Sequence, residues 1–181
     1  MEPLKYFSEL KLAIQKAPID AINAAIKEIQ IAIDDGKNVF VCGNGGSALT
    51  ASHYVTDWGK MRWVNKNKQF KVFCLSDNVG MLTAYSNDVS YHDVFSEALK
   101  NYGASGDVLI VVSGSGNSEN VVKALATASE MGVITIGVSG FLGGKVKEFA
   151  DISVHFEVSD LQIVEDLHLS FGHIVMKQLC L

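Results

Sequence analysis

Apolar and polar positions fall into blocks along this chain that predict helices and strands in turn. Two helix-periodic segments come first, at 4–16 and 19–34, separated near Pro18. Continuous apolar runs then predict five buried strands, at 38–42, 70–75, 107–112, 133–138 and 152–156. Helix-periodic sequence lies between and after them, at 48–61, 79–85, 91–101, 119–131, 145–149 and from about 160 to the end. This order predicts an α/β fold in one domain, 1–181, with a central parallel sheet of about five strands flanked by helices.

The leading helical pair, residues 1–36, carries more apolar positions than one face of a monomer needs. They are Leu10, Leu12, Ile14, Ile19, Ile22, Ile26, Ile29, Ile31 and Ile33. The second helix is apolar on several sides, which favours burial between subunits and hence a homo-oligomer. The alternative is that it packs across the edge of its own sheet.

Two strand-to-helix connections consist of small polar residues and glycine. They are Cys42-Gly43-Asn44-Gly45-Gly46-Ser47 and Ser113-Gly114-Ser115-Gly116-Asn117-Ser118. Neither fits a dinucleotide fingerprint or a P-loop. Parallel sheets bind ligands beyond the carboxyl ends of their strands, and a helix N-terminus favours an anion. The alternative is that these residues only cap helices, but three serines in six residues exceed what one cap needs. We therefore expect a phosphosugar site, with hydroxyls and main-chain amides holding the phosphate.

Composition narrows the class of function. The net charge is −5 and Arg62 is the one arginine, which argues against nucleic-acid binding. The chain is 48% hydrophobic and 19% charged, as in a globular protein. Cys42, Cys74 and Cys180 are scattered without metal-site spacing, which is typical of free thiols in a reducing cytoplasm. No apolar run approaches a membrane span, so we expect no membrane partner.

Two helices carry titratable groups at helical spacing. His53 and Asp57 are four residues apart and share one face, while Glu165, His168 and His173 lie in the final helix. A histidine with a carboxylate is a metal half-site, an acid/base pair or a surface ion pair. Glu165 and His173 are about 12 Å apart along the axis, so they reach one metal only by leaning together; otherwise they belong to different sites or subunits. His168 lies about 140° around the helix from His173, so we expect a structural role.

These motifs, together with Ser86-Asn87-Asp88 and Glu165-Asp166-Leu167-His168, resemble the sugar isomerase (SIS) domain family. Within it the chain is similar to phosphoheptose isomerases, which interconvert sedoheptulose 7-phosphate and D-glycero-D-manno-heptose 7-phosphate. The resemblance covers nearly the whole chain and implies a cytoplasmic homotetramer with sites built between subunits.

The resemblance also implies a role for each matching position. Asn44, Gly45, Gly46, Ser47, Asn87, Asp88 and Glu165 would line the sugar site. Ser113, Ser115 and Ser118 would bind the phosphate, with Gly114 in the same loop. His53, Asp57, Glu165 and His173 would hold a divalent ion, Zn²⁺, and Asp57 and His173 would be the catalytic pair.

Some positions depart from the family pattern. Aspartate replaces glutamate at 57, glutamate replaces glutamine at 165, glycine replaces threonine at 114, and Gln162 stands where the family has aspartate. Lys60 or Arg62 only approximates a basic residue of the family. A base misplaced by about 1 Å costs on the order of a hundredfold in rate. These departures therefore leave open another sugar phosphate as substrate, or another reaction.

Two functions of different class follow. The first is an aldose–ketose isomerase working through an enediol, with Asp57 as base and His173 and the metal beside the developing oxyanion. The alternative is a non-catalytic phosphosugar-binding regulator of the same fold. Retention of His173 and of an acid at position 57 favours the enzyme. The sequence leaves open whether the product enters lipopolysaccharide, capsule or another heptose pathway.

Overall fold

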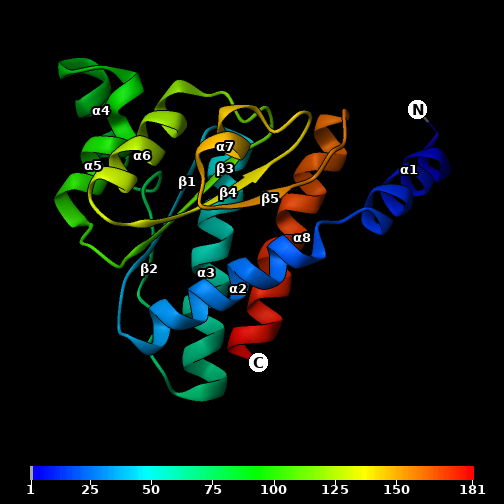
Figure 1. The fold of residues 1–181 in the computed structure, drawn as a ribbon, viewed down its shortest axis with the longest axis horizontal. Coiled ribbons are helices and arrows are strands. Elements are labelled where there is room, and N and C mark those ends of the chain that lie inside the picture. The colour runs from blue at the N-terminus through cyan, green and yellow to red at the C-terminus, as the bar shows by residue number, and fades with distance from the viewer. Residues whose placement is uncertain (1) are drawn as a thin grey trace.

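Five parallel strands form the centre of the molecule, with helices on both faces (Figure 1). The computed structural model describes residues 2–181. The strands are β1 (Val39–Gly43), β2 (Val72–Cys74), β3 (Val108–Ser113), β4 (Ile134–Ser139) and β5 (Ile152–His155). The helices are α1 (Pro3–Gln15), α2 (Ile19–Asp34), α3 (Gly46–Lys66), α4 (Val79–Asp88), η1 (Tyr91–Asp93, a 3₁₀ turn), α5 (Val94–Tyr102), α6 (Glu119–Glu130), α7 (Gly144–Phe149) and α8 (Leu161–Cys180). The predicted fold class is confirmed.

The strand order explains where a ligand can bind. It is β2-β1-β3-β4-β5, so the chain leaves β1 toward one edge of the sheet and returns to build the other half from β3. Strands β1 and β3 pair along their lengths, from Val39 opposite Val108 to Gly43 opposite Val112. Connections that diverge in this way leave a crevice beyond the carboxyl ends of the two strands. Both Gly/Ser loops begin at that point.

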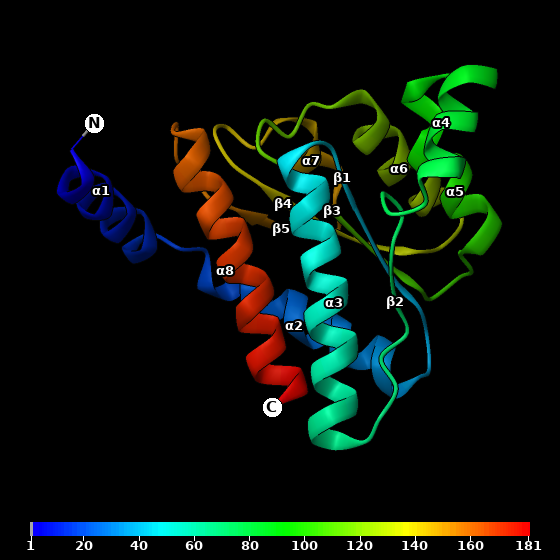
Figure 2. The ribbon, with the colours of Figure 1, turned by 180° about the vertical axis from the view of Figure 1, so that it is seen from behind.

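Two apolar layers hold the helices on the sheet. Successive strand residues point to opposite faces, so Val41 and Ile110 join one layer while Phe40 and Leu109 join the other. Helices α2, α3 and α8 cover the first face, and α5 and α6 cover the second (Figure 1). Helix α3 lies beside α8, and both begin at the carboxyl end of the sheet (Figure 2).

Element boundaries differ from the prediction where packing, rather than periodicity, sets them. Helix α3 continues to Lys66 and ends at Asn67, whose φ of 49° is left-handed. The segment 91–101 divides into η1 and α5, because the Ser90 hydroxyl accepts a hydrogen bond from the His92 N–H and starts a separate turn. Residues 86–88 form the last turn of α4 rather than a loop.

The two leading helices have different surroundings. Helix α2 buries Ile22, Ala25 and Ile29 in the core of its own chain, which is the alternative that the sequence left open for it. Helix α1 instead projects from the body, joined by an extended segment (Figures 1 and 2). Leu4 and Phe7 on it are 80% and 64% exposed. Apolar surface available for another subunit therefore lies on α1, and also on α2, where Ile19 and Ile31 are 58% and 41% exposed.

None of the helices within residues 2–181 is long and apolar enough to cross a membrane.

Candidate functional site

A cavity of about 360 Å³ lies where the two Gly/Ser loops meet, beyond β1 and β3. It is lined by Asn44, Ser47, Val112, Ser113, Gly114, Ser115, Ser118, Phe141, Leu161 and Glu165. The structure thus brings together seven of the residues expected to bind substrate. Asn87 and Asp88, at the end of α4, are exposed and contact each other through an amide-to-carboxylate hydrogen bond of 2.7 Å, away from the wall of this cavity.

The serine hydroxyls of the second loop are arranged to donate. Ser113 Oγ accepts from the Gly116 N–H at 3.2 Å, and Ser115 Oγ accepts from the Asn117 N–H at 3.3 Å. Each hydroxyl therefore keeps its own proton for a ligand. Ser118 occupies the N-cap of α6, yet its side chain makes no capping hydrogen bond within the described residues. Helix capping alone does not explain these serines, and three hydroxyls beside a helix N-terminus suit a phosphate.

One glycine fixes the course of this loop. Gly116 has a φ of 68°, and a Cβ there would lie 1.9 Å from the Gly143 carbonyl oxygen. No side chain fits in that space, so the loop passes under the turn before α7 only with glycine at 116. The Gly116 carbonyl in turn accepts from the Val146 N–H at 3.0 Å, which ties the loop to α7.

Glu165 reaches the cavity from α8 and closes against the start of α3. A Cβ on Gly46 would lie 2.8 Å from Glu165 Oε1. The glycine at 46 therefore makes room for the carboxylate, which lies beside the positive N-terminal end of α3.

Three side chains from α3 and α8 converge on one point. His53 Nε2 lies 3.1 Å from His173 Nε2 and 3.2 Å from Asp57 Oδ2, and His173 Nε2 lies 3.8 Å from the same carboxylate oxygen. The pairing of His53 and Asp57 at helical spacing is as the sequence predicts. Their association with His173, 120 residues further along the chain, comes from the packing of α3 on α8.

Hydrogen bonds from large buried side chains fix that packing. The Tyr54 hydroxyl donates to the His168 carbonyl, and Trp58 Nε1 donates to the Gly172 carbonyl at 2.9 Å. The two rings stack with centroids 4.9 Å apart, and both side chains are fully buried. A Cβ on Gly172 would lie 2.1 Å from Tyr54 Cε1, so the helices approach this closely only over a glycine. His53 directly precedes Tyr54 in the chain, and His173 directly follows Gly172.

The cluster fits a divalent ion by its donor atoms and their separations. Metal–nitrogen bonds of 2.0–2.1 Å in a tetrahedral site place neighbouring donor atoms about 3.3 Å apart. The observed separations of 3.1, 3.2 and 3.8 Å bracket that value. Two imidazoles, a carboxylate and an open position match a catalytic zinc site. Glu165 lies outside the group of three whose donor atoms are mutually close, so its role as a fourth ligand stays a prediction.

His168 has no place in this cluster. It is 1% exposed, and neither ring nitrogen has a hydrogen-bond partner among residues 2–181. Its ring lies against Phe156, with centroids 5.9 Å apart. Burial lowers the pKa of His168 to about 4, which keeps the ring neutral. The expectation that it points away from His173 and is structural agrees with this position.

Sequence reasoning missed Phe141 and Leu161 in the cavity wall. Phe141 has a φ of 49° and follows the carboxyl end of β4, which is the same edge that the two Gly/Ser loops occupy. The position of Phe141 just after a predicted strand was the signal in the sequence that could have identified it as a cavity residue. Leu161 Cδ1 would lie 2.9 Å from a Cβ at position 114, so this leucine occupies the space that a threonine side chain would enter.

Comparison with known proteins places the fold and the motifs in one family. The SIS domain model matches residues 4–140. The phosphoheptose isomerase of Clostridium acetobutylicum is 36% identical over 157 residues, which cover 87% of this chain and 80% of that protein. That of Chlorobaculum parvum is 33% identical, over 98% of this chain and 86% of that protein. A solved structure of the phosphoheptose isomerase from Neisseria gonorrhoeae superposes with a TM-score of 0.90 at 26% identity, over 97% and 95% of the two chains.

The chain therefore belongs to the SIS domain family. Its resemblance to the phosphoheptose isomerases within that family is confirmed, and so is the expectation of a phosphosugar isomerase.

Proposed function

We propose that the chain interconverts sedoheptulose 7-phosphate and D-glycero-D-manno-heptose 7-phosphate. The observation that carries this proposal is that the His53, Asp57 and His173 cluster lies on the same two helices that border the serine-lined cavity. Ser47 in the cavity and His53 in the cluster are six residues apart in α3, or about 9 Å along the axis. That separation suits a substrate with a phosphate at one end of its carbon chain and a carbonyl at the other.

The cavity would hold the phosphate end. Ser113, Ser115 and Ser118 each have a hydroxyl proton to donate, and the N-terminus of α6 adds main-chain donors and a positive dipole. Glu165, beside the start of α3, would face the sugar rather than the phosphate because two anions repel.

The cluster would carry out the proton transfers at the reacting end. The Asp57 carboxylate would take the proton from the carbon next to the carbonyl and return it to the neighbouring carbon of the enediol. His173 would exchange a proton with the two sugar oxygens of the enediol, which are those on the carbonyl carbon and on the carbon next to it. Asp57 Oδ2 and His173 Nε2 are the atoms of these side chains that are directed into the cluster.

His53, Asp57 and His173 would also hold the divalent ion, proposed as Zn²⁺ with Glu165 as a further ligand. When bound, the ion supplies positive charge that stabilises a developing oxyanion. Aspartate at 57 is one methylene shorter than the family's glutamate, but the measured separations keep it within the cluster.

The test combines elemental analysis of the purified protein with turnover of sedoheptulose 7-phosphate. We expect bound zinc and measurable isomerisation. Asp57→Asn should lower kcat by a factor on the order of 100 to 10,000, because it removes the base. Asp20→Asn, on the exposed first turn of α2, is the matched control and should leave kcat unchanged. Tight binding of the sugar phosphate without turnover would instead support the regulator.

We further propose a cytoplasmic homotetramer, with sites completed between subunits. Its support is the exposed apolar surface of α1.

A further inference from the structure

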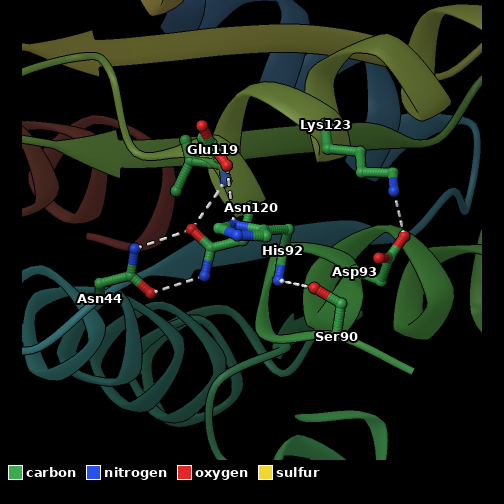
Figure 3. A network of polar contacts seen from close by, with 8 residues as sticks. Asn44, Ser90, His92, Asp93, Glu119, Asn120 and Lys123 are labelled. Atoms are coloured by element: carbon green, nitrogen blue, oxygen red, sulfur yellow. Dashed lines mark hydrogen bonds and ion pairs between the residues drawn. The ribbon is translucent and has the colours of Figure 1, made fainter. Parts of the chain in front are cut away.

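A polar network beside the cavity joins three segments that are distant in sequence (Figure 3). Asn44 comes from the first Gly/Ser loop, Asn120 from the first turn of α6, and Tyr91 from η1. The Asn44 and Asn120 amides face each other and exchange two hydrogen bonds: Asn44 Nδ2 donates to Asn120 Oδ1 at 2.8 Å, and Asn120 Nδ2 donates to Asn44 Oδ1 at 2.9 Å. The Tyr91 hydroxyl donates to the same Asn44 oxygen at 2.7 Å.

The backbone N–H of Val121 fixes the orientation of the Asn120 and Asn44 side-chain amides. The Val121 N–H donates to Asn120 Oδ1 at 2.9 Å. Because a backbone N–H is only a donor, the Asn120 oxygen must face it, and the Asn120 nitrogen must then face Asn44. That nitrogen needs an acceptor, so Oδ1 of Asn44 is turned toward Asn120. The orientation of a buried asparagine, 2% exposed, is thereby passed on to a residue of the cavity wall.

The hydrogen bonds that Asn44 already makes leave one N–H of its side-chain amide unused. Its oxygen already accepts twice, and one hydrogen of its Nδ2 is used. One N–H remains, and it is a donor. Asn44 lines the cavity, so this N–H is the side-chain group it has left for a ligand there, and a donor suits a hydroxyl or carbonyl oxygen of a sugar.

We propose that Asn120, assisted by Tyr91, is a positioning residue that holds the Asn44 amide with an N–H toward the sugar. Asn120 acts through Asn44 and does not line the cavity itself. The proposal rests on the proposed function, since it assumes that Asn44 binds the sugar part of a sugar phosphate.

Ion pairs hold the same segments together without touching Asn44. His92 Nδ1 lies 3.0 Å from Glu119 Oε2, and Lys123 pairs with Asp93, so η1 is attached to α6 on both sides of Asn120 (Figure 3). His92 adjoins Tyr91 in the chain, which makes His92→Gln a matched control: it removes a contact of the network but leaves all hydrogen bonds of Asn44 in place.

The test measures binding of sedoheptulose 7-phosphate and, separately, of inorganic phosphate by calorimetry. Asn120→Leu keeps the shape of the side chain but removes both hydrogen bonds to Asn44. We expect its Kd for the sugar phosphate to rise at least tenfold and its Kd for inorganic phosphate to change less than twofold, because the serine loop is untouched. His92→Gln should behave as the unaltered protein does in both titrations.

A double-mutant cycle separates positioning from a general structural effect. If Asn120 acts through Asn44, Asn44→Ala/Asn120→Leu binds the sugar phosphate as weakly as Asn44→Ala alone. Losses that multiply in the double variant would overturn the proposal, as would an unchanged Kd for Asn120→Leu. Should Asn120→Leu not fold, Tyr91→Phe removes one donor at an exposed position, and an unchanged Kd there would also count against it. Failure of the unaltered protein to bind the sugar phosphate at all would instead refute the proposed function.

Discussion

At the scale of single residues, the three serines of the second loop differ from ordinary loop serines. Two of them accept main-chain N–H groups and so keep their hydroxyl protons free for another acceptor, and the third lies at a helix N-cap without using its side chain there. The sequence predicted a phosphate site from their number and from their place between a strand and a helix N-terminus. The structure adds the reason that they are available to donate.

Removing two of these hydroxyls should weaken phosphate binding without unfolding the protein. We expect Ser115→Ala/Ser118→Ala to raise the Kd for sedoheptulose 7-phosphate by a factor on the order of 100 to 10,000, because each hydrogen bond to a charged group contributes about 1.5–3 kcal/mol net and about 1.4 kcal/mol is a tenfold change in Kd. Calorimetry measures this. Ser129→Ala, an exposed serine near the end of α6, is the control, and an unchanged Kd in the double variant would exclude these serines as the phosphate site.

His168 should make stability depend on pH. Its pKa is about 4 in the folded chain and about 6.5 when unfolded, so between these values the unfolded form binds the proton. The stability gained from the neutral buried ring is complete above pH 6.5 and is lost as pH falls toward 4, by up to about 3 kcal/mol.

Urea denaturation of the unaltered protein and of His168→Gln, at pH 7 and at pH 5, measures this contribution. Carboxylates titrate in both proteins, so the difference between them isolates the imidazole. We expect the unaltered protein to lose more stability than the variant on going to pH 5. Equal losses would show that His168 is already protonated or accessible in the folded chain.

At the scale of elements, the contact between α3 and α8 determines the geometry of the cluster. Helical spacing placed His53 and Asp57 on one face, whereas only the family resemblance placed His173 beside them, because spacing alone does not show in which register two helices pack. Tyr54, Trp58 and Gly172 set this register, and they carry no periodicity that distinguishes them from other core residues.

Gly172→Ala should move the helices apart. The new methyl group would collide with the Tyr54 ring, and overpacking of this kind costs about 1–3 kcal/mol. Because His53 and His173 adjoin the contact, we also expect zinc affinity to fall by a factor on the order of ten. Gly59→Ala in α3 is the control: its methyl group meets only Val72, at 3.7 Å, and should stabilise the helix by about 0.5–1 kcal/mol.

Thermal unfolding of the metal-free proteins and competitive zinc titration measure the two effects separately. If Gly172→Ala binds zinc as tightly as the unaltered protein, the close contact serves stability alone.

At the scale of the whole molecule, the sequence predicted the class of fold because its strands are short, continuous and apolar and its helices are periodic. It did not predict the strand order, which brings the loops after β1 and β3 together. It also assigned the surplus apolar surface to α2. Ile22 and Ile29 cover their own sheet, while Ile19 and Ile31 on the same helix are 58% and 41% exposed. Periodicity alone does not show whether the same chain or another one covers an apolar face.

The last prediction concerns α1, which the rest of the chain leaves largely uncovered. Within residues 2–15 only Ala13 is buried, whereas Leu4, Phe7, Leu12 and Ile14 are 80%, 64%, 60% and 54% exposed. The Tyr6 hydroxyl donates to Asp166 at 2.7 Å and attaches the helix to α8, and this bond raises the pKa of Tyr6 to about 12. An apolar helix that is attached to its own chain but left largely uncovered is suited to pack on a second copy of the chain, and closed assemblies of identical copies are the common outcome.

We expect light scattering of the unaltered protein at micromolar concentration to give the mass of a tetramer. Leu4→Ser/Phe7→Ser should shift it to smaller species, because each change removes apolar area from the contact. Lys11→Ser on the same helix is the control for helix propensity and should leave the mass unchanged. A monomer in the unaltered protein would refute the assembly. It would also require each site to be completed by the residues of one chain.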